Sequence, residues 1–279
     1  MTIDVEDYFQ VSAFAAHIAR SNWEERECRI ERNVDHILAM LAQRGIKATF
    51  FTLGWIADRY PSLVRAIVDE GHELASHGYG HDRVTDLTRH AFDADIRRAK
   101  AILEDASGSS VIGYRAPSFS IGASNLWALD ALERAGHRYS SSIYPIRHDH
   151  YGMPDAPRFA HRLDCGLIEI PATTVRILDR NLPSSGGGYF RLLPYPASRW
   201  MLKRVNTVDG QPAVFYFHPW EIDVDQPRIK GVGAKTRFRH YVNIDRMEAR
   251  LQKLLGDFDW GRMDAIFLDS GRLAHSSAH

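Results

Sequence analysis

The feature that most constrains the fold is a repeated alternation between short apolar runs of β type and amphipathic stretches of helical type. This alternation is typical of a mainly parallel sheet whose strands are joined by crossover helices. The repetition of strand and helix through 279 residues favours a barrel or a distorted barrel. We expect strands near residues 2–5, 47–53, 72–76, 111–114, 167–170, 213–217 and 265–268.

Helices are predicted where apolar residues recur with helical spacing. Val34, Ile37, Leu38 and Leu41 follow the i, i+3, i+4, i+7 pattern, and Gly45 is well placed to end that helix. Further helices are expected near residues 61–69, 88–105, 124–135, 197–205 and 243–255.

Two stretches rich in glycine, proline or serine are predicted as long irregular loops. They cover residues 144–162 and 181–189, and the second includes the run Ser184-Ser-Gly-Gly-Gly188. Loops of this length often shape binding sites. Because no internal repeat or linker marks a boundary, we expect residues 1–279 to form a single α/β domain.

Composition excludes several classes of partner. Lys plus Arg equals Asp plus Glu at 35 each, so no net charge attracts nucleic acid or an anionic membrane surface. No apolar run is long enough to insert into a membrane, and an acidic segment stands where an export signal needs basic and apolar residues. Cys28 and Cys165 are too few for a disulfide framework and are expected as free thiols. A cytoplasmic protein is therefore expected.

Acidic and histidine side chains follow the first and third predicted strands. Asp4, Glu6 and Asp7 end the first strand, where three carboxylates repel one another unless a cation or hydrogen-bond donors compensate. His77 and His81 follow the third strand with glycines between them, a spacing that lets two imidazoles reach one ion. In a chain with 14 histidines that spacing also arises by chance.

Arginine and histidine follow two later predicted strands. Arg115 precedes a turn at Pro117 and is either functional or a structural partner of a carboxylate. His218 follows the strand at 213–217 and is either a general acid or a hydrogen-bonded histidine that caps a buried strand. Tyr216 and Trp220 are candidates to stack on a sugar ring, although aromatics at a strand end often belong to the core.

Taken in order along the chain, these motifs resemble those of the polysaccharide deacetylase family, also called the NodB homology or carbohydrate esterase family 4 group. The acidic pair, the His-x-x-x-His pair, Arg115-Ala-Pro117 and Phe215-Tyr-Phe-His218 correspond to four of its motifs. The phrases Phe215-Tyr-Phe-His-Pro-Trp-Glu-Ile222 and Arg239-His-Tyr-Val-Asn243 look closer still to a bacterial branch linked with exopolysaccharide and exosortase gene clusters.

The resemblance implies a distorted (β/α) barrel that removes the N-acetyl group from a sugar with the help of a divalent metal ion. It implies Asp4 as general base and His77 and His81 as ligands of zinc, with cobalt or nickel as alternatives. The carboxylate ligand is Glu6 or Asp7, and we favour Asp7 for its shorter side chain.

Further roles follow from the same likeness. It assigns His218 to protonation of the leaving amine, the backbone N–H of Ser118 to the oxyanion, and Arg115 to orientation of the base. An N-acetylated carbohydrate is the expected partner, and the oligomeric state is not indicated.

One departure concerns the fourth family motif, whose acid engages the motif arginine. Ser140 stands at that position, so Arg115 has either another partner or none. Two alternatives therefore stay open. The first is an allantoinase-like hydrolase of a small cyclic amide, and the second is a catalytically weak carbohydrate-binding protein on the same scaffold.

Overall fold

The computed structural model describes residues 1–148 and 151–268. One 8-stranded sheet has the order β10-β1-β2-β3-β4-β5-β7-β6, and β8 and β9 form a separate hairpin. Neighbours in the large sheet are parallel, except that β6 runs antiparallel to β7. The strands are β1 (Thr2–Val5), β2 (Thr49–Thr52), β3 (Glu73–Ser76), β4 (Gly113–Tyr114), β5 (Tyr139–Ser140), β6 (His161–Arg162), β7 (Ile168–Glu169), β8 (Thr174–Ile177), β9 (Arg180–Pro183) and β10 (Tyr216–Phe217).

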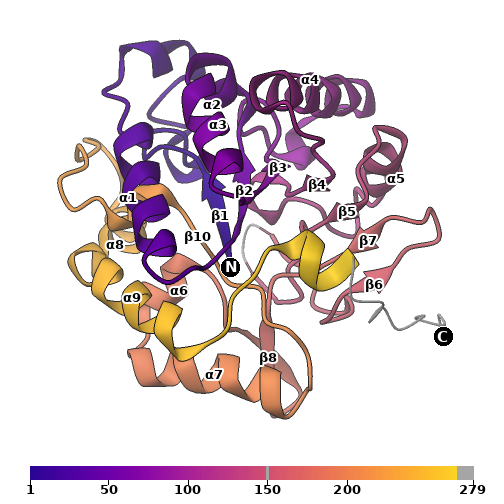
Figure 1. Ribbon diagram of the computed structural model, residues 1–279, viewed down its shortest axis with the longest axis vertical. Coiled ribbons are helices and arrows are strands. Elements are labelled where there is room, and N and C mark those ends of the chain that lie inside the picture. Colours follow the sequence, from indigo (N-terminus) through magenta and orange to yellow (C-terminus); the bar gives the residue numbers. More distant parts are fainter. Residues whose placement is uncertain (149–150, 269–279) are drawn as a thin grey trace.

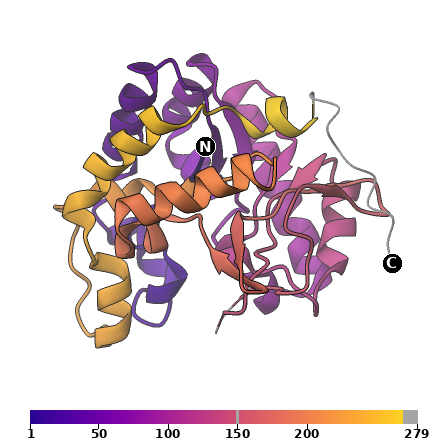
Figure 2. The ribbon, with the colours of Figure 1, turned by 90° about the horizontal axis from the view of Figure 1, so that it is seen from below.

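Helices cover the outside of this sheet (Figure 1). Those of the first half lie around β1 to β5, whereas α7 and α9 lie near the first residue of the chain (Figures 1 and 2). The α-helices are α1 (Ile30–Ala42), α2 (Gly54–Arg59), α3 (Pro61–Asp69), α4 (Arg89–Ser107), α5 (Trp127–Arg134), α6 (Gly187–Leu192), α7 (Tyr195–Thr207), α8 (Ala234–Tyr241) and α9 (Met247–Asp257).

The sheet is a curled half-barrel with two edges, β10 and β6. Within residues 1–148 and 151–268 no backbone pairing joins those edges, so the barrel is distorted and open. The predicted α/β class and distorted (β/α) barrel are thereby confirmed. Because β1, β2, β3, β4 and β10 are parallel, the residues that follow them meet at one end of the sheet.

Local sequence explains why the first crossover forms. The four periodic positions of α1, Val34, Ile37, Leu38 and Leu41, are all buried. Gly45 follows the helix with a φ of +63°, a left-handed conformation that glycine adopts without steric cost. The predicted helix and its termination are confirmed, and α1 returns the chain to the sheet at β2.

Several sequence predictions differ from the structure. The strand expected at 265–268 is wrong, because Asp264–Leu268 is a π-helix, η7. The loop expected at 181–189 contains most of β9 and the start of α6. The loop expected at 144–162 is irregular up to β6, apart from residues 149–150, which lie outside the described part. The strands β5, β6 and β8 and the helices α2 and α8 have no counterpart among the predicted elements.

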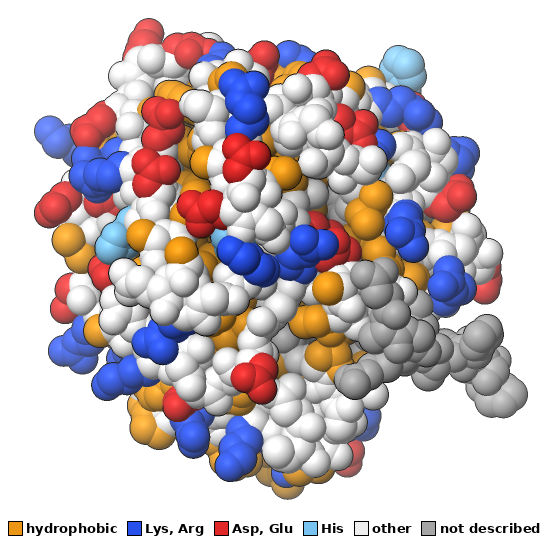
Figure 3. Space-filling view, viewed as in Figure 1, with side chains coloured by type: hydrophobic (Ala, Val, Ile, Leu, Met, Phe, Trp, Pro, Cys, Tyr) orange, Lys and Arg blue, Asp and Glu red, His pale blue; other side chains and the backbone are white. Residues whose placement is uncertain are grey.

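The surface carries both signs of charge. Figure 3 shows acidic and basic side chains interspersed over the face seen in Figure 1, as expected from 35 residues of each sign. Along the described residues, no helix combines the length and the apolar character needed to cross a membrane.

Candidate metal centre and catalytic site

Three side chains at the carboxyl end of the sheet form a possible metal site. One donor atom each of Glu6, His77 and His81 lies within 4.8 Å of the other two. Glu6 follows β1, whereas His77 follows β3 and His81 closes the turn after it. Glu6 and His77 are each only 2% exposed, so the group is withdrawn from bulk water.

A backbone contact orients the imidazole of His77, and His81 has an unusual backbone conformation. The Nδ1–H of His77 donates to the carbonyl of Arg115 at 2.8 Å, and this leaves Nε2 as the lone-pair nitrogen. Burial lowers the pKa of His77 to about 4, so its ring is neutral near pH 7, as a metal ligand must be. His81 has a φ of +57°, a strained conformation of the kind that clusters at functional sites.

The carboxylate of Glu6 completes the donor set. Its Oε2 lies 2.6 Å from His81 Nε2, but no described residue gives this buried oxygen a hydrogen bond of good geometry. Burial opposes ionisation, yet the nearby His81, His218 and His77 outweigh it and hold the pKa of Glu6 below its usual range. A buried, ionised oxygen beside two imidazole nitrogens fits a divalent cation.

The preference for Asp7 as ligand is corrected by this geometry. Asp7 Oδ1 accepts from Tyr8 N at 2.8 Å, and Oδ2 accepts from Arg29 N at 2.6 Å and from Cys28 Sγ at 3.3 Å. Asp7 is not a member of the Glu6 group. Burial raises the pKa of Asp7 to about 6. Its role is to hold the start of α1 beside β1.

The candidate base Asp4 is paired with Arg115. Arg115 is fully buried, and its Nη1 donates to Asp4 Oδ1 at 2.5 Å and to Thr2 Oγ1 at 2.9 Å. The other side of the guanidinium donates to Ser141, from Nε to the carbonyl at 3.2 Å and from Nη2 to Oγ at 3.1 Å. Of the two possibilities left open by Ser140, another partner for Arg115 or none, the structure shows the first: Asp4, with Thr2 and Ser141 beside it.

The acid expected at position 140 has a counterpart on the next strand. Glu169 of β7 lies opposite Ser140 of β5 and is fully buried. Its Oε1 accepts from the backbone N–H groups of Ser142 and Ile143 at 2.9 and 2.8 Å. Glu169 thereby fixes the segment whose Ser141 holds Arg115. An acidic residue within the apolar run 167–170 was the available sequence signal.

The candidate acid His218 faces the same end of the sheet. Its Nε2 lies 3.6 Å from Glu6 Oε1 and 4.0 Å from Asp4 Oδ2. Burial lowers the pKa of His218, but the carboxylates of Glu6, Glu221 and Asp4 outweigh burial and raise it to about 9. A charged His218 can therefore donate a proton near neutral pH.

The two predicted stacking residues are buried instead of open to a sugar. Trp220 is 5% exposed, and its ring stacks on the rings of His218 and His240, with centroids 5.2 and 4.1 Å away. Its Nε1–H donates to Glu6 Oε1 at 3.2 Å. Tyr216 is 8% exposed and contacts the Phe119 ring. Trp220 thus supports Glu6 and His218, and Tyr216 belongs to an aromatic cluster.

Ser118 lies in the tight turn that follows Arg115. Its φ is +55°, and its Oγ donates to Ser12 Oγ at 2.8 Å. Ser12 Oγ also lies 3.3 Å from His81 Nδ1. The turn that contains Ser118 is thereby linked to the turn that contains His81.

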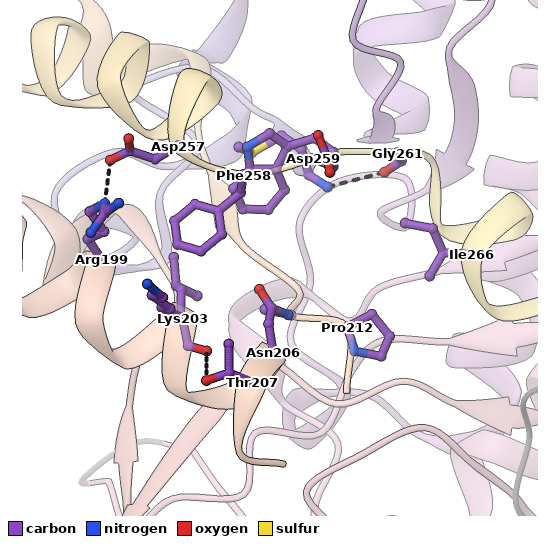
Figure 4. Close-up of a pocket in the computed structure, with 14 residues that line it drawn as sticks. Arg199, Lys203, Asn206, Thr207, Pro212, Asp257, Phe258, Asp259, Gly261 and Ile266 are labelled. Carbon is purple, nitrogen blue, oxygen red and sulfur yellow. Dashed lines mark hydrogen bonds and ion pairs between the residues drawn. The ribbon is translucent and has the colours of Figure 1, made fainter. Parts of the chain in front are cut away.

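A cavity of about 480 Å³ lies elsewhere in the molecule (Figure 4). It is lined by residues of α7, by the segment after α9 and by Met1 at the start of β1. None of the candidate metal or catalytic residues lines it. Its place beside Met1 separates it from the carboxyl end of β1, where Asp4 and Glu6 lie.

Two family models together match most of the chain. Residues 25–140, which include His77, His81 and Arg115, match the family model described as "Polysaccharide deacetylase". Residues 141–268, which include His218, match the model described as "Domain of unknown function (DUF3473)".

Among curated proteins, the chain is similar to a peptidoglycan-N-acetylglucosamine deacetylase of Bacillus cereus, with 33% identity over 95 residues, 34% of this chain and 34% of that protein. It is also similar to a chitooligosaccharide deacetylase of Sinorhizobium fredii, with 28% identity over 109 residues, 39% of this chain and 48% of that protein. The chain therefore spans about a third to a half of the length of these relatives.

Two crystal structures share the fold. One is described as a polysaccharide deacetylase from Mycobacterium smegmatis, with a TM-score of 0.63 and 17% identity over 100% of this chain and 92% of that one. The other is the Puue allantoinase, with a TM-score of 0.53 and 17% identity over 84% and 70% of the two chains. These structures show the fold alone, whereas the family models show that residues 25–140 belong to the polysaccharide deacetylase family, the NodB or carbohydrate esterase 4 group, and that residues 141–268 match the DUF3473 model.

Proposed function

We propose that this protein is a metal-dependent deacetylase that hydrolyses the N-acetyl group of a sugar in a polysaccharide or its precursor. The observation that carries the proposal is that a candidate base pair and a candidate metal donor set lie close together at one end of the sheet. The Asp4–Arg115 pair lies beside the Glu6, His77 and His81 donor set, and His218 approaches both carboxylates within 4.0 Å. The named activities of the relatives, on peptidoglycan N-acetylglucosamine and on chitooligosaccharides, support this class of substrate.

Glu6, His77 and His81 would hold the cation, with zinc as the first candidate and cobalt or nickel as alternatives. A bound divalent ion supplies Lewis acidity, which polarises the acetyl carbonyl and acidifies water. Three protein ligands leave coordination positions open, which is typical of a catalytic site and not of a structural one.

The chain's own residues provide the proton transfers. Asp4, held by Arg115, accepts the proton of the attacking water, and His218 Nε2 delivers a proton to the departing nitrogen. The backbone N–H of Ser118, in the turn after Arg115, is the proposed donor to the oxyanion. The products are acetate and a free amino sugar.

The two alternative functions are less well supported. The allantoinase likeness rests on the fold alone, and the complete set of two histidines and a carboxylate favours the sugar deacetylase. The weak-binder alternative depended on Ser140, but Arg115 has partners in Asp4, Thr2 and Ser141. The substitution at position 140 therefore does not imply an inactive site.

The direct test is acetate release from a panel of N-acetylated oligosaccharides, which includes chitooligosaccharides, peptidoglycan fragments and an N-acetylated exopolysaccharide. We expect release from at least one substrate class, loss of release after chelation and recovery on addition of zinc. A protein that binds these sugars but releases no acetate with any added metal contradicts the proposal.

A further inference from the structure

We propose that Glu221 is a positioning residue that orients His218 for proton donation, and that Arg191 and Gly187 hold Glu221 in place. This inference rests on the proposed deacetylase function. It gives the DUF3473 segment a defined contribution, because all four residues lie within 141–268.

The contact between His218 and Glu221 fixes the orientation of the imidazole. Glu221 Oε2 lies 3.1 Å from His218 Nδ1 and accepts the backbone N–H of His218 at 3.0 Å. A carboxylate only accepts hydrogen bonds, so Nδ1 carries the hydrogen of this contact. The other nitrogen, Nε2, is then the atom that faces Asp4 and Glu6.

The ionised state of Glu221 is maintained by Arg191. Both side chains are 1% exposed, and Arg191 Nε donates to Glu221 Oε1 at 2.9 Å. Burial opposes ionisation of the carboxyl, but Arg191 and His218 outweigh it and lower the pKa of Glu221 to about 2. Arg191 is itself fixed, because its Nη1 donates to the carbonyls of His240 and Val242 at 2.8 Å each.

The glycines at the start of α6 make room for this carboxylate. A Cβ atom at Gly187 would overlap the Glu221 carboxylate, whereas a Cβ at Gly188 would meet no atom within 4 Å. Neither residue has a positive φ, so alanine fits the backbone at both positions. Gly187 is therefore needed for close approach to Glu221, and its neighbour is not.

Glu221 also caps the short 3-10 helix η5 (Pro219–Ile222), through the backbone N–H of His218. Capping alone explains that one bond, but it does not explain the contact with Nδ1 or the buried charge of Arg191. If Glu221 only caps the helix, its replacement should lower kcat equally for every substrate. If Glu221 positions His218, its replacement should lower kcat only for substrates to which His218 must donate a proton.

The proton balance of the reaction defines the kinetic test. Hydrolysis adds water across the C–N bond: hydroxide joins the acetyl carbon, Asp4 takes one proton, and His218 Nε2 gives one proton to the nitrogen as the bond breaks. With 4-nitrophenyl acetate the leaving group departs as an anion and needs no proton. A comparison of an N-acetylated sugar with 4-nitrophenyl acetate therefore separates an effect on proton donation from general damage to the site.

For Glu221→Gln and Gly187→Ala we expect kcat for N-acetylchitooligosaccharides to fall by on the order of 100-fold. We expect kcat for 4-nitrophenyl acetate to stay within about twofold, and Gly188→Ala to match the parent on both substrates. An equal fall in kcat for the N-acetylchitooligosaccharides and for 4-nitrophenyl acetate would overturn the inference.

A spectroscopic measurement decides the inference without reference to turnover. In 15N-histidine NMR of the metal-free full chain, with His218 assigned from His218→Gln, we expect a hydrogen-bonded Nδ1–H in the parent and in Gly188→Ala. That signal should be lost or shifted in Glu221→Gln and Gly187→Ala, and an unchanged His218 signal would overturn the inference. Absence of acetate release by the parent would instead contradict the proposed deacetylase.

Discussion

Replacement of Arg115 by methionine is expected to destabilise the metal-free protein by about 3–5 kcal/mol, because it leaves the Asp4 carboxylate buried without its cation. Arg115 is 0% and Asp4 2% exposed, and their side chains are 2.5 Å apart. The loss is a large fraction of a typical domain stability of about 5–15 kcal/mol. The same variant should also lower kcat, since Asp4 is no longer oriented.

A double-mutant cycle separates the ion pair from general loss of packing. Asp4→Asn removes the buried charge, so Arg115→Met combined with Asp4→Asn should cost about 2 kcal/mol less than the sum of the single variants. The matched control is Arg97→Met, which breaks the exposed Arg97–Asp93 pair of α4. That pair has half-exposed partners and should be worth less than about 1 kcal/mol.

The assay is urea-induced unfolding followed by circular dichroism at pH 7, in the presence of a chelator. The cycle needs equal slopes of free energy against urea for all variants, so that a change in midpoint reports a change in stability. The reasoning would be refuted if the changes in unfolding free energy for Arg115→Met and Asp4→Asn were strictly additive. It would also be refuted if Arg115→Met lowered the unfolding free energy no more than Arg97→Met does.

The remaining predictions concern metal binding and pH. Glu6→Gln should weaken zinc binding by on the order of 100-fold or more in calorimetric titration, whereas Asp7→Asn should change it less than about tenfold; the reverse order would restore Asp7 as the ligand. Burial lowers the pKa of His137 from 6.5 to about 3. Between pH 6.5 and about 3 the His137 imidazole is protonated in the unfolded chain but not in the folded one. His137 therefore contributes stability at neutral pH that is lost as the pH falls below 6.5. His137→Phe should therefore reduce the slope of unfolding free energy against pH by about 1.4 kcal/mol per pH unit between pH 4 and 6, in denaturation at several pH values; an unchanged slope would show that the imidazole is not buried neutral.

The parts of the fold that sequence could predict are those with strong periodicity. The apolar spacing of Val34 to Leu41 indicates α1, and the runs at 47–53 and 72–76 contain β2 and β3. The strand β5 has two residues and no periodicity of its own, since its pairing with β4 and β7 defines it. The apolar run at 265–268 is too short to distinguish a strand from a helix, and it forms η7.

Some residues of the site could also be predicted from sequence, and others could not. Ordered motifs were enough to select His77, His81, Asp4, Arg115 and His218 as candidates, and the structure brings these side chains to one end of the sheet.

The choice between Glu6 and Asp7 depends instead on the direction of each side chain, which the motif does not specify. The contributions of Glu169 and Glu221 depend on contacts between neighbouring strands and on a buried arginine. Such contacts follow from tertiary packing and have no local sequence pattern.

The central claim is that Asp4 acts as base beside a metal held by Glu6, His77 and His81. The most direct measurement is acetate release by the zinc-loaded Asp4→Asn protein, with zinc content determined on the same sample. We predict about one zinc ion per chain, as in the parent, and a kcat lower by at least about 100-fold. A zinc-loaded Asp4→Asn protein that releases acetate at the parent rate would contradict the account.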